Sequence, residues 1–170
     1  MRDLGPIRRH TLAITVDNES GVLAKIVGLF SARGYNIESL TVADITESHD
    51  VSRITIVTSG SQEVIDQIEA QLDRLVTVHK VSDLTELGPH VEREMALLKV
   101  VGGGDKRLEA MRLADIYRAR VVDATIESFI FEITGSTEKV NTFIALMREV
   151  GLVEVARGGV VAISRGKDPS

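Results

Sequence analysis

The chain has 170 residues, a formal net charge of −5 and a pI near 5.4, with 44% apolar and 4% aromatic residues. The acidic balance argues against nucleic acid as the main partner, because neutralising phosphates requires a basic face. The absence of cysteine excludes disulfides, thiol catalysis and cysteine-bound zinc. We see neither a signal peptide nor an apolar run long enough to span a bilayer, so we expect a cytoplasmic protein without a membrane partner.

The first half alternates between strand and helix patterns. Residues 1–9 form a leader, and Leu12, Ile14 and Val16 fall on one face of the strand that follows. The predicted order is strand 10–17, helix 20–33, strand 37–45, strand 51–58, helix 62–74 and strand 75–82. This order predicts a ferredoxin-like βαββαβ domain over 10–83, with helices on one face of a four-stranded antiparallel sheet.

The second half repeats the plan after a polar, Gly-Pro-containing linker at 84–94. We expect a helical stripe of Leu108, Met111, Ala114 and Tyr117. The predicted order is strand 95–101, helix 106–118, strand 119–125, strand 128–134, helix 136–150 and two short strands at 152–156 and 160–164. The fold class is therefore α+β, with a second ferredoxin-like domain at 95–166 and a tail at 167–170.

No set of residues suggests catalysis. The sequence lacks a nucleophile elbow, a Ser-x-x-Lys motif and a convergent acid/base pair, so we expect a protein that is not an enzyme and has no catalytic residue. No two histidines share a helix at metal-ligand spacing, so we expect no metal site; the histidines are His10, His49, His79 and His90. A solvated hairpin tip is favoured over an adventitious cation site at Asp44, Glu47, His49 and Asp50.

The loop Asn18-Glu19-Ser20-Gly21 precedes a strongly apolar helix and supplies turn and cap residues. Free N–H groups at such a helix start can bind a small anion, although the same residues also make a plain helix start. A free amino acid would place its carboxylate near Gly21 and Val22 and its ammonium near the Asn18 side chain or a strand carbonyl. Asn36 and Ile37 join this site if a second copy pairs edge to edge.

Several segments resemble one family. Asn18–Leu23 is NESGVL and Gly34–Val42 is GYNIESLTV, and the likeness continues at His90–Glu94, Val153–Arg157 and Ser164–Gly166. These segments resemble the small regulatory subunit of acetolactate synthase (acetohydroxyacid synthase), and the first domain looks like its ACT domain. The likeness covers nearly the whole chain after the leader.

The resemblance implies a regulatory subunit that activates a large catalytic subunit and confers feedback inhibition by valine in branched-chain amino acid synthesis. The cofactors thiamine diphosphate, Mg and FAD are then expected on the catalytic subunit and none on this chain. It also implies a homodimer through the ACT domains, with valine at their interface. The matching positions are Asn18, Gly21, Val22 and Leu23 from one chain, with Asn36 and Ile37 from the other.

Two departures from the family pattern, Gly158 and the Thr46–Asp50 tip, leave the contacts with the catalytic subunit open. The sequence also leaves open the stoichiometry with that subunit and whether leucine or isoleucine bind. The alternative is an ACT-type amino-acid-sensing regulator of another partner, such as a transcription regulator. That alternative would need a DNA-binding element, and the sequence offers no basic arm beyond Arg8-Arg9.

Overall fold

The computed structural model describes residues 6–170, so five residues of the predicted leader lie outside the described part. Two compact units are present. One takes in the chain up to Val91 together with Val160–Ser170, and the other is Glu92–Gly159. Within residues 6–170, no helix is both long and apolar enough to cross a membrane.

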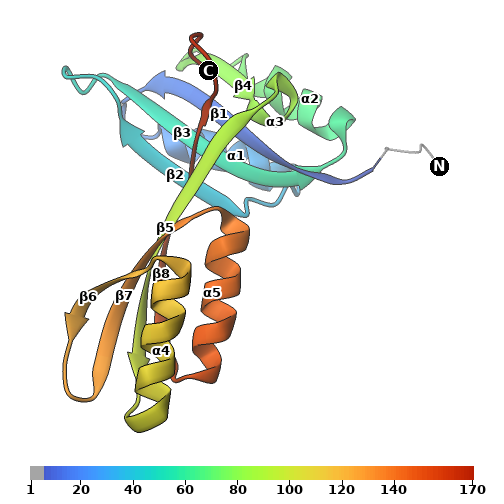
Figure 1. The fold of residues 1–170 in the computed structure, drawn as a ribbon. Coiled ribbons are helices and arrows are strands. Elements are labelled where there is room, and N and C mark those ends of the chain that lie inside the picture. The colour runs from blue at the N-terminus through green and yellow to red at the C-terminus, as the bar shows by residue number, and fades with distance from the viewer. Residues whose placement is uncertain (1–5) are drawn as a thin grey trace. The chain divides into compact units, whose positions relative to one another are not determined.

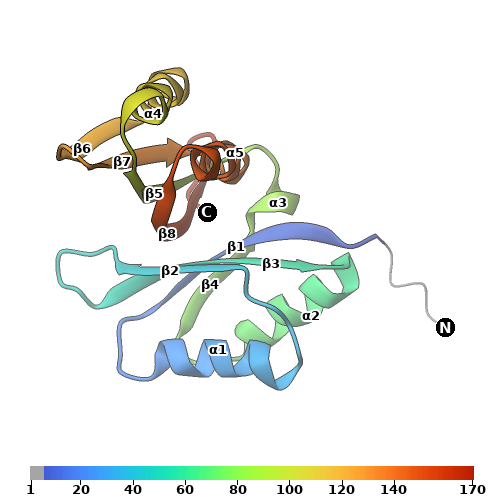
Figure 2. The same ribbon diagram turned by 90° about the horizontal axis from the view of Figure 1, so that it is seen from below.

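The first unit is a helix-covered antiparallel sheet. Its strands lie in the order β2-β3-β1-β4 (Figure 1), and α1 and α2 cover one face (Figure 2). The elements are β1 (Arg8–Asp17), α1 (Val22–Ala32), β2 (Ser39–Asp44), β3 (Val51–Gly60), α2 (Gln62–Leu72), β4 (Val78–Asp83) and the short α3 (Leu84–Leu87).

The core of this unit follows from the alternation in β1. Leu12 and Ile14 pair with Ile56 and Ile54 of β3 and are fully buried. Phe30 of α1 is fully buried in the same cluster. Burial of each such side chain stabilises the fold by roughly 1.5–3 kcal/mol, which fixes the helices to this face of the sheet.

Residues from the end of the sequence lie on the opposite face of the same sheet. The Arg53 guanidinium donates to the Ala162 carbonyl at 3.0 Å and to the Ser170 carbonyl at 2.9 Å. Thr41 Oγ1 donates to the Val160 carbonyl at 2.9 Å. Ala162 is buried in a small cluster with Ala13 and Leu84. The first sheet is therefore covered on both faces, by α1 and α2 on one face and by residues of Val160–Ser170 on the other.

The second unit repeats the plan, with strands in the order β6-β7-β5-β8. Ala110 and Ala114 of α4 and Phe143 of α5 pack with Phe131 of β7 in its core. The elements are β5 (His90–Val101), α4 (Gly104–Tyr117), β6 (Arg120–Ala124), β7 (Ser128–Gly135), α5 (Thr137–Glu149) and β8 (Leu152–Ser164). The predicted α+β class and the two βαββαβ units are confirmed.

Some element predictions are wrong. The two short strands at 152–156 and 160–164 are one strand, β8, because Gly159 adopts a φ of +78° without ending the strand. Strand β5 begins at His90 rather than at 95. In the predicted stripe of α4, Leu108 is 60% exposed and Ala110 is buried in its stead, whereas Met111, Ala114 and Tyr117 pack in or against the core.

Candidate functional site

The loop before α1 is built around Gly21. This residue is the N-cap of α1 with φ +86°, and a Cβ placed there would meet no described atom within 4 Å. The Val22 N–H makes only a 3.3 Å hydrogen bond to the Glu19 carbonyl. Within the predicted turn-and-cap segment Asn18–Gly21 the N-cap is thus Gly21, and no side chain of residues 6–170 caps this helix.

The start of α1 lacks a side-chain cap, as do the starts of α2 and α4, but unlike theirs its first turn carries no acidic side chain. In α5 the Ser136 hydroxyl accepts from the Lys139 N–H at 3.3 Å, and in α3 the Asp83 carboxylate accepts from the Thr85 N–H at 2.9 Å. The first turn of α1 has neither such an acceptor nor an acidic side chain. The positive end of its dipole and its first N–H groups are thus available to an external anion, such as a carboxylate.

Asn18 does not cap the helix because its hydrogen bonds go elsewhere. Its backbone N–H donates to the Asp50 carbonyl and its side-chain Nδ2 donates to the His49 carbonyl, both at 2.8 Å. Both acceptors lie in the turn between β2 and β3. The loop 18–21 is therefore fixed to that turn, a contact between segments too far apart in the sequence for local patterns to predict.

The other predicted residues differ in their exposure. Val22 is 3% exposed and Leu23 packs against the core, so both side chains belong to the core of this unit. Asn36 is exposed, and its carbonyl accepts from Thr58 Oγ1 at 2.6 Å. Ile37 packs against the core just before β2. The structure thus gathers Asn18–Leu23 in one turn, and among the described residues no hydrogen bond joins that turn to Asn36 or Ile37.

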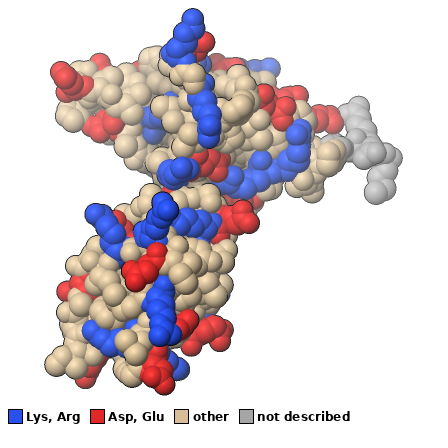
Figure 3. Space-filling model, viewed as in Figure 1, with Lys and Arg blue, Asp and Glu red and all other residues tan. Residues whose placement is uncertain are grey.

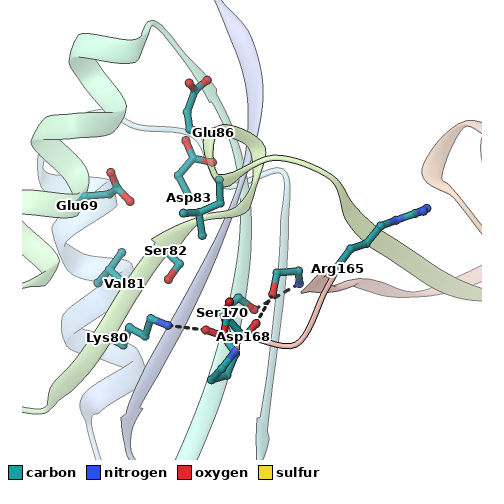
Figure 4. Close-up of a pocket in the computed structure, with 12 residues that line it drawn as sticks. Glu69, Lys80, Val81, Ser82, Asp83, Glu86, Arg165, Asp168 and Ser170 are labelled. Carbon is teal, nitrogen blue, oxygen red and sulfur yellow. Dashed lines mark hydrogen bonds between the residues drawn. The ribbon is translucent and has the colours of Figure 1, made fainter.

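A separate groove of about 690 Å³ lies against β4 and the C-terminal residues (Figure 4). Lys80 Nζ donates to the Pro169 carbonyl at 2.8 Å at this groove. Burial raises the pKa of Glu69, and the nearby Asp83 carboxylate raises it further. None of the residues predicted for the amino-acid site lines this groove.

A buried polar pair lies beside this groove. His10 Nδ1 and Asp83 Oδ2 are 2.7 Å apart and both side chains are buried. Together with Glu86 they form a group whose potential ligand atoms lie within 4.8 Å of one another. Glu86 is paired with Arg8 at 3.1 Å, and Asp83 also caps α3. These carboxylates already have partners, and no sequence spacing could have revealed a pair 73 residues apart.

Acidic side chains gather at the turn between β2 and β3 (Figure 3). Asp44 pairs with His49, while Asp50 accepts from the Ser48 hydroxyl at 2.6 Å and from the Thr46 hydroxyl at 2.7 Å. These two hydrogen bonds lower the pKa of Asp50. The carboxylates of Asp44 and Asp50 thus have partners within the chain.

Comparison with known proteins agrees with this architecture. The family model described as an AHAS small subunit-like ACT domain matches residues 12–80, and the model of the small subunit of acetolactate synthase matches residues 93–166. The acetolactate synthase isozyme 3 small subunit of Escherichia coli is 46% identical over 159 residues, covering 93% of this chain and 96% of that protein. The acetolactate synthase small subunit of Haemophilus influenzae is 46% identical over 160 residues, covering 94% and 97%.

The likeness extends to a solved structure. The crystal structure of the acetolactate synthase small subunit from Thermotoga maritima superposes with a TM-score of 0.84 at 41% identity, covering 95% of this chain and 99% of that one. The resemblance seen in the sequence is confirmed by these matches over both halves. This chain belongs to the family of acetolactate synthase small subunits, which are regulatory and non-catalytic.

Proposed function

We propose that this chain binds valine between the ACT units of two copies and so confers feedback inhibition on the large subunit of acetolactate synthase, which it otherwise activates. Thiamine diphosphate, Mg and FAD then belong to the catalytic subunit. The setting is branched-chain amino acid synthesis, and the location is the cytoplasm. The proposal rests on the family and on the arrangement of the α1 start.

The observation that carries the ligand assignment is that α1 starts with neither a side-chain cap nor an acidic residue in its first turn. Its N–H groups lack a side-chain acceptor within the described chain, and Gly21 keeps the approach open. A carboxylate bound there gains charge-assisted hydrogen bonds and the favourable end of the helix dipole. Asn18 lies three residues before Gly21, and its side-chain oxygen can accept a hydrogen bond from an ammonium group.

A second copy would complete the site. Strand β2 is at the edge of its sheet, next to β3 on one side only. Val42 on this strand is 45% exposed, and Asn36 and Ile37 lie shortly before the strand, which begins at Ser39. Edge strands present unpaired backbone groups that favour pairing with another chain. Two-fold pairing through β2 would bring Asn36 and Ile37 of the partner toward the loop of the first chain.

Inhibition would follow from differential binding. If valine binds one arrangement of the dimer more tightly, it shifts the attached catalytic subunit toward a less active state. A coupling free energy of roughly 1–3 kcal/mol changes an equilibrium by about 5–150-fold. Valine therefore needs no contact with the catalytic centre.

The test is Gly21→Asp. The new carboxylate would lie where the carboxylate of valine belongs, and we expect calorimetric titration to detect no valine binding. The assembled enzyme should then lose its inhibition by valine. A residue with a side chain at φ +86° costs about 1 kcal/mol, so the variant should still fold.

The matched control is Gly103→Asp, which introduces the same side chain at the N-cap glycine of α4. Gly103 has φ −124°, so aspartate fits there without strain. We expect this control to bind valine as the unmodified chain does. Unchanged valine affinity in Gly21→Asp would place the site elsewhere. Parallel titrations with leucine, isoleucine and serine would establish the selectivity of the site.

A further inference from the structure

We infer that the β2–β3 tip, Thr46–Asp50, is a positioning element that holds the Asn18 amide with Oδ1 toward the ligand, where it accepts a hydrogen bond from the ammonium group of the bound amino acid. This inference rests on the proposed function and assigns the recognition of one end of the ligand. The tip itself does not touch the ligand in this proposal.

The orientation of the amide follows from its partner. The His49 carbonyl is an acceptor only, so the amide must turn its donor end, Nδ2, toward it at 2.8 Å. The adjacent Asp50 carbonyl accepts from the Asn18 N–H at 2.8 Å, which fixes the backbone of the same residue. Oδ1 is then left as an acceptor with no partner among residues 6–170.

The tip is ordered by its own hydrogen bonds. The hydroxyls of Thr46 and Ser48 both donate to Asp50 Oδ1, at 2.7 Å and 2.6 Å. The His49 N–H donates to the Thr46 carbonyl at 3.1 Å, which closes the turn. His49 has φ +55°, a conformation that a residue with a side chain holds only when its surroundings impose it.

This strained turn points two consecutive carbonyls, those of His49 and Asp50, at one residue. Both hydroxyls act on the Asp50 side chain, so they hold the carbonyl positions indirectly. Loss of the hydroxyls would let the turn relax and the Asn18 amide rotate. The expected consequence is a weaker bond to the ammonium group with little effect on the carboxylate, which binds at the α1 N–H groups.

The arrangement divides recognition between two ends of the ligand. The start of α1 suits a carboxylate, and the Asn18 oxygen suits a cationic donor. A ligand with both groups on one carbon satisfies both. The same carbon skeleton without the amine, isovalerate, would satisfy only the helix start. The chain should therefore prefer valine to isovalerate, and that preference should depend on the tip.

The experiment measures the dissociation constants of valine and isovalerate for the full-length chain and for the double variant Thr46→Val/Ser48→Ala. We expect the variant to bind valine about tenfold more weakly, the loss of about one charge-assisted hydrogen bond. Its affinity for isovalerate should stay the same. The ratio of the two constants is the decisive readout, because general loosening of the fold would weaken both ligands alike.

The matched control is Thr125→Val/Ser128→Ala in the turn between β6 and β7. There the Thr125 hydroxyl accepts from the Ser128 N–H at 3.0 Å and the two hydroxyls lie 2.9 Å apart, so the control removes a similar pair of hydroxyls from another hairpin. It should leave both dissociation constants unchanged.

The outcomes separate the two proposals. If the unmodified chain binds no valine, alone or with the catalytic subunit, the proposed function fails and this inference fails with it. If the unmodified chain binds valine and the tip variant keeps the same preference over isovalerate, the proposed function stands and the inference is overturned. If the preference for valine over isovalerate falls in the tip variant but not in the control variant, the inference is supported.

Discussion

Glu69 on α2 is half withdrawn from water at the groove beside β4. Burial raises the pKa of its carboxyl group, the Asp83 carboxylate raises it further, and a backbone hydrogen bond from Asp83 offsets part of this rise. The folded chain therefore binds this proton more tightly than the unfolded chain, whose reference value is 4.5. The stability due to the protonated group is present below that value and is lost as the pH rises through the folded-state pKa.

Replacing Glu69 with glutamine removes this charge and keeps an oxygen for the Asp83 N–H. We expect Glu69→Gln to raise the melting temperature at pH 7, with a difference that disappears toward pH 4. Thermal unfolding monitored by circular dichroism at several pH values provides the measurement. Glu127→Gln on the exposed turn before β7 serves as control and should show no such trend. A Glu69→Gln variant less stable than the unmodified chain at pH 7 would refute this assignment.

Prediction from the sequence succeeded for a residue whose role depends on local backbone conformation. Gly21 belongs to the segment predicted to supply the turn and cap, and it is the N-cap of α1 with φ +86°. The hydrogen bond from the Asn18 side chain to the His49 carbonyl could not be predicted, since the two residues lie 31 positions apart. Cap preferences are local, and here a tertiary hydrogen bond outweighed them.

At the scale of elements, β2 is the edge of the first sheet and presents Val42, which is 45% exposed. An apolar residue on an exposed edge strand favours association, whereas lysine at such a position opposes it. The proposed dimer would therefore be sensitive to one charge on this strand.

We expect Val42→Lys to shift the chain from dimer to monomer, as measured by sedimentation velocity. Valine affinity should fall with it, because the site would need both chains. Val161→Lys is the matched control on β8, where the valine is 56% exposed. That control should leave the assembly intact. A Val42→Lys chain that sediments as the unmodified chain does would rule out pairing through β2.

The elements most strongly patterned in the sequence were predicted best. In β1 the alternating residues Leu12, Ile14 and Val16 are buried as expected. The continuity of β8 was missed because Arg157-Gly158-Gly159 reads as a turn, and only pairing with β5 keeps such a sequence extended. In α4 the predicted stripe residues Met111, Ala114 and Tyr117 do pack in or against the core, while Leu108 is exposed and Ala110, a small residue with little periodic signal, is buried instead.

For the whole molecule, Arg53 is the main polar anchor of the C-terminal residues on the first sheet. Its guanidinium donates to the Ala162 carbonyl, the Ser170 carbonyl and the Ser170 hydroxyl at 2.9–3.0 Å. Burial lowers the pKa of Arg53. These hydrogen bonds secure a segment that otherwise contributes few buried apolar side chains to the first unit.

We expect Arg53→Gln to destabilise the chain by about 2 kcal/mol, the scale of lost charge-assisted hydrogen bonds. Amide hydrogen exchange should become faster over Val160–Ser170. Arg74→Gln, an exposed arginine at the end of α2, is the control and should leave exchange in that segment unchanged. Unaltered exchange at 160–170 in Arg53→Gln would show that the apolar contacts of Ala162 suffice to hold the segment.

The return of the chain to the first unit at Val160 also sets an order of events during synthesis. The second unit, Glu92–Gly159, is one uninterrupted stretch and can fold from its own residues once they have emerged from the ribosome. The first unit is interrupted, and one face of its sheet waits for Val160–Ser170. The half of the protein that is translated first is therefore the half that is finished last.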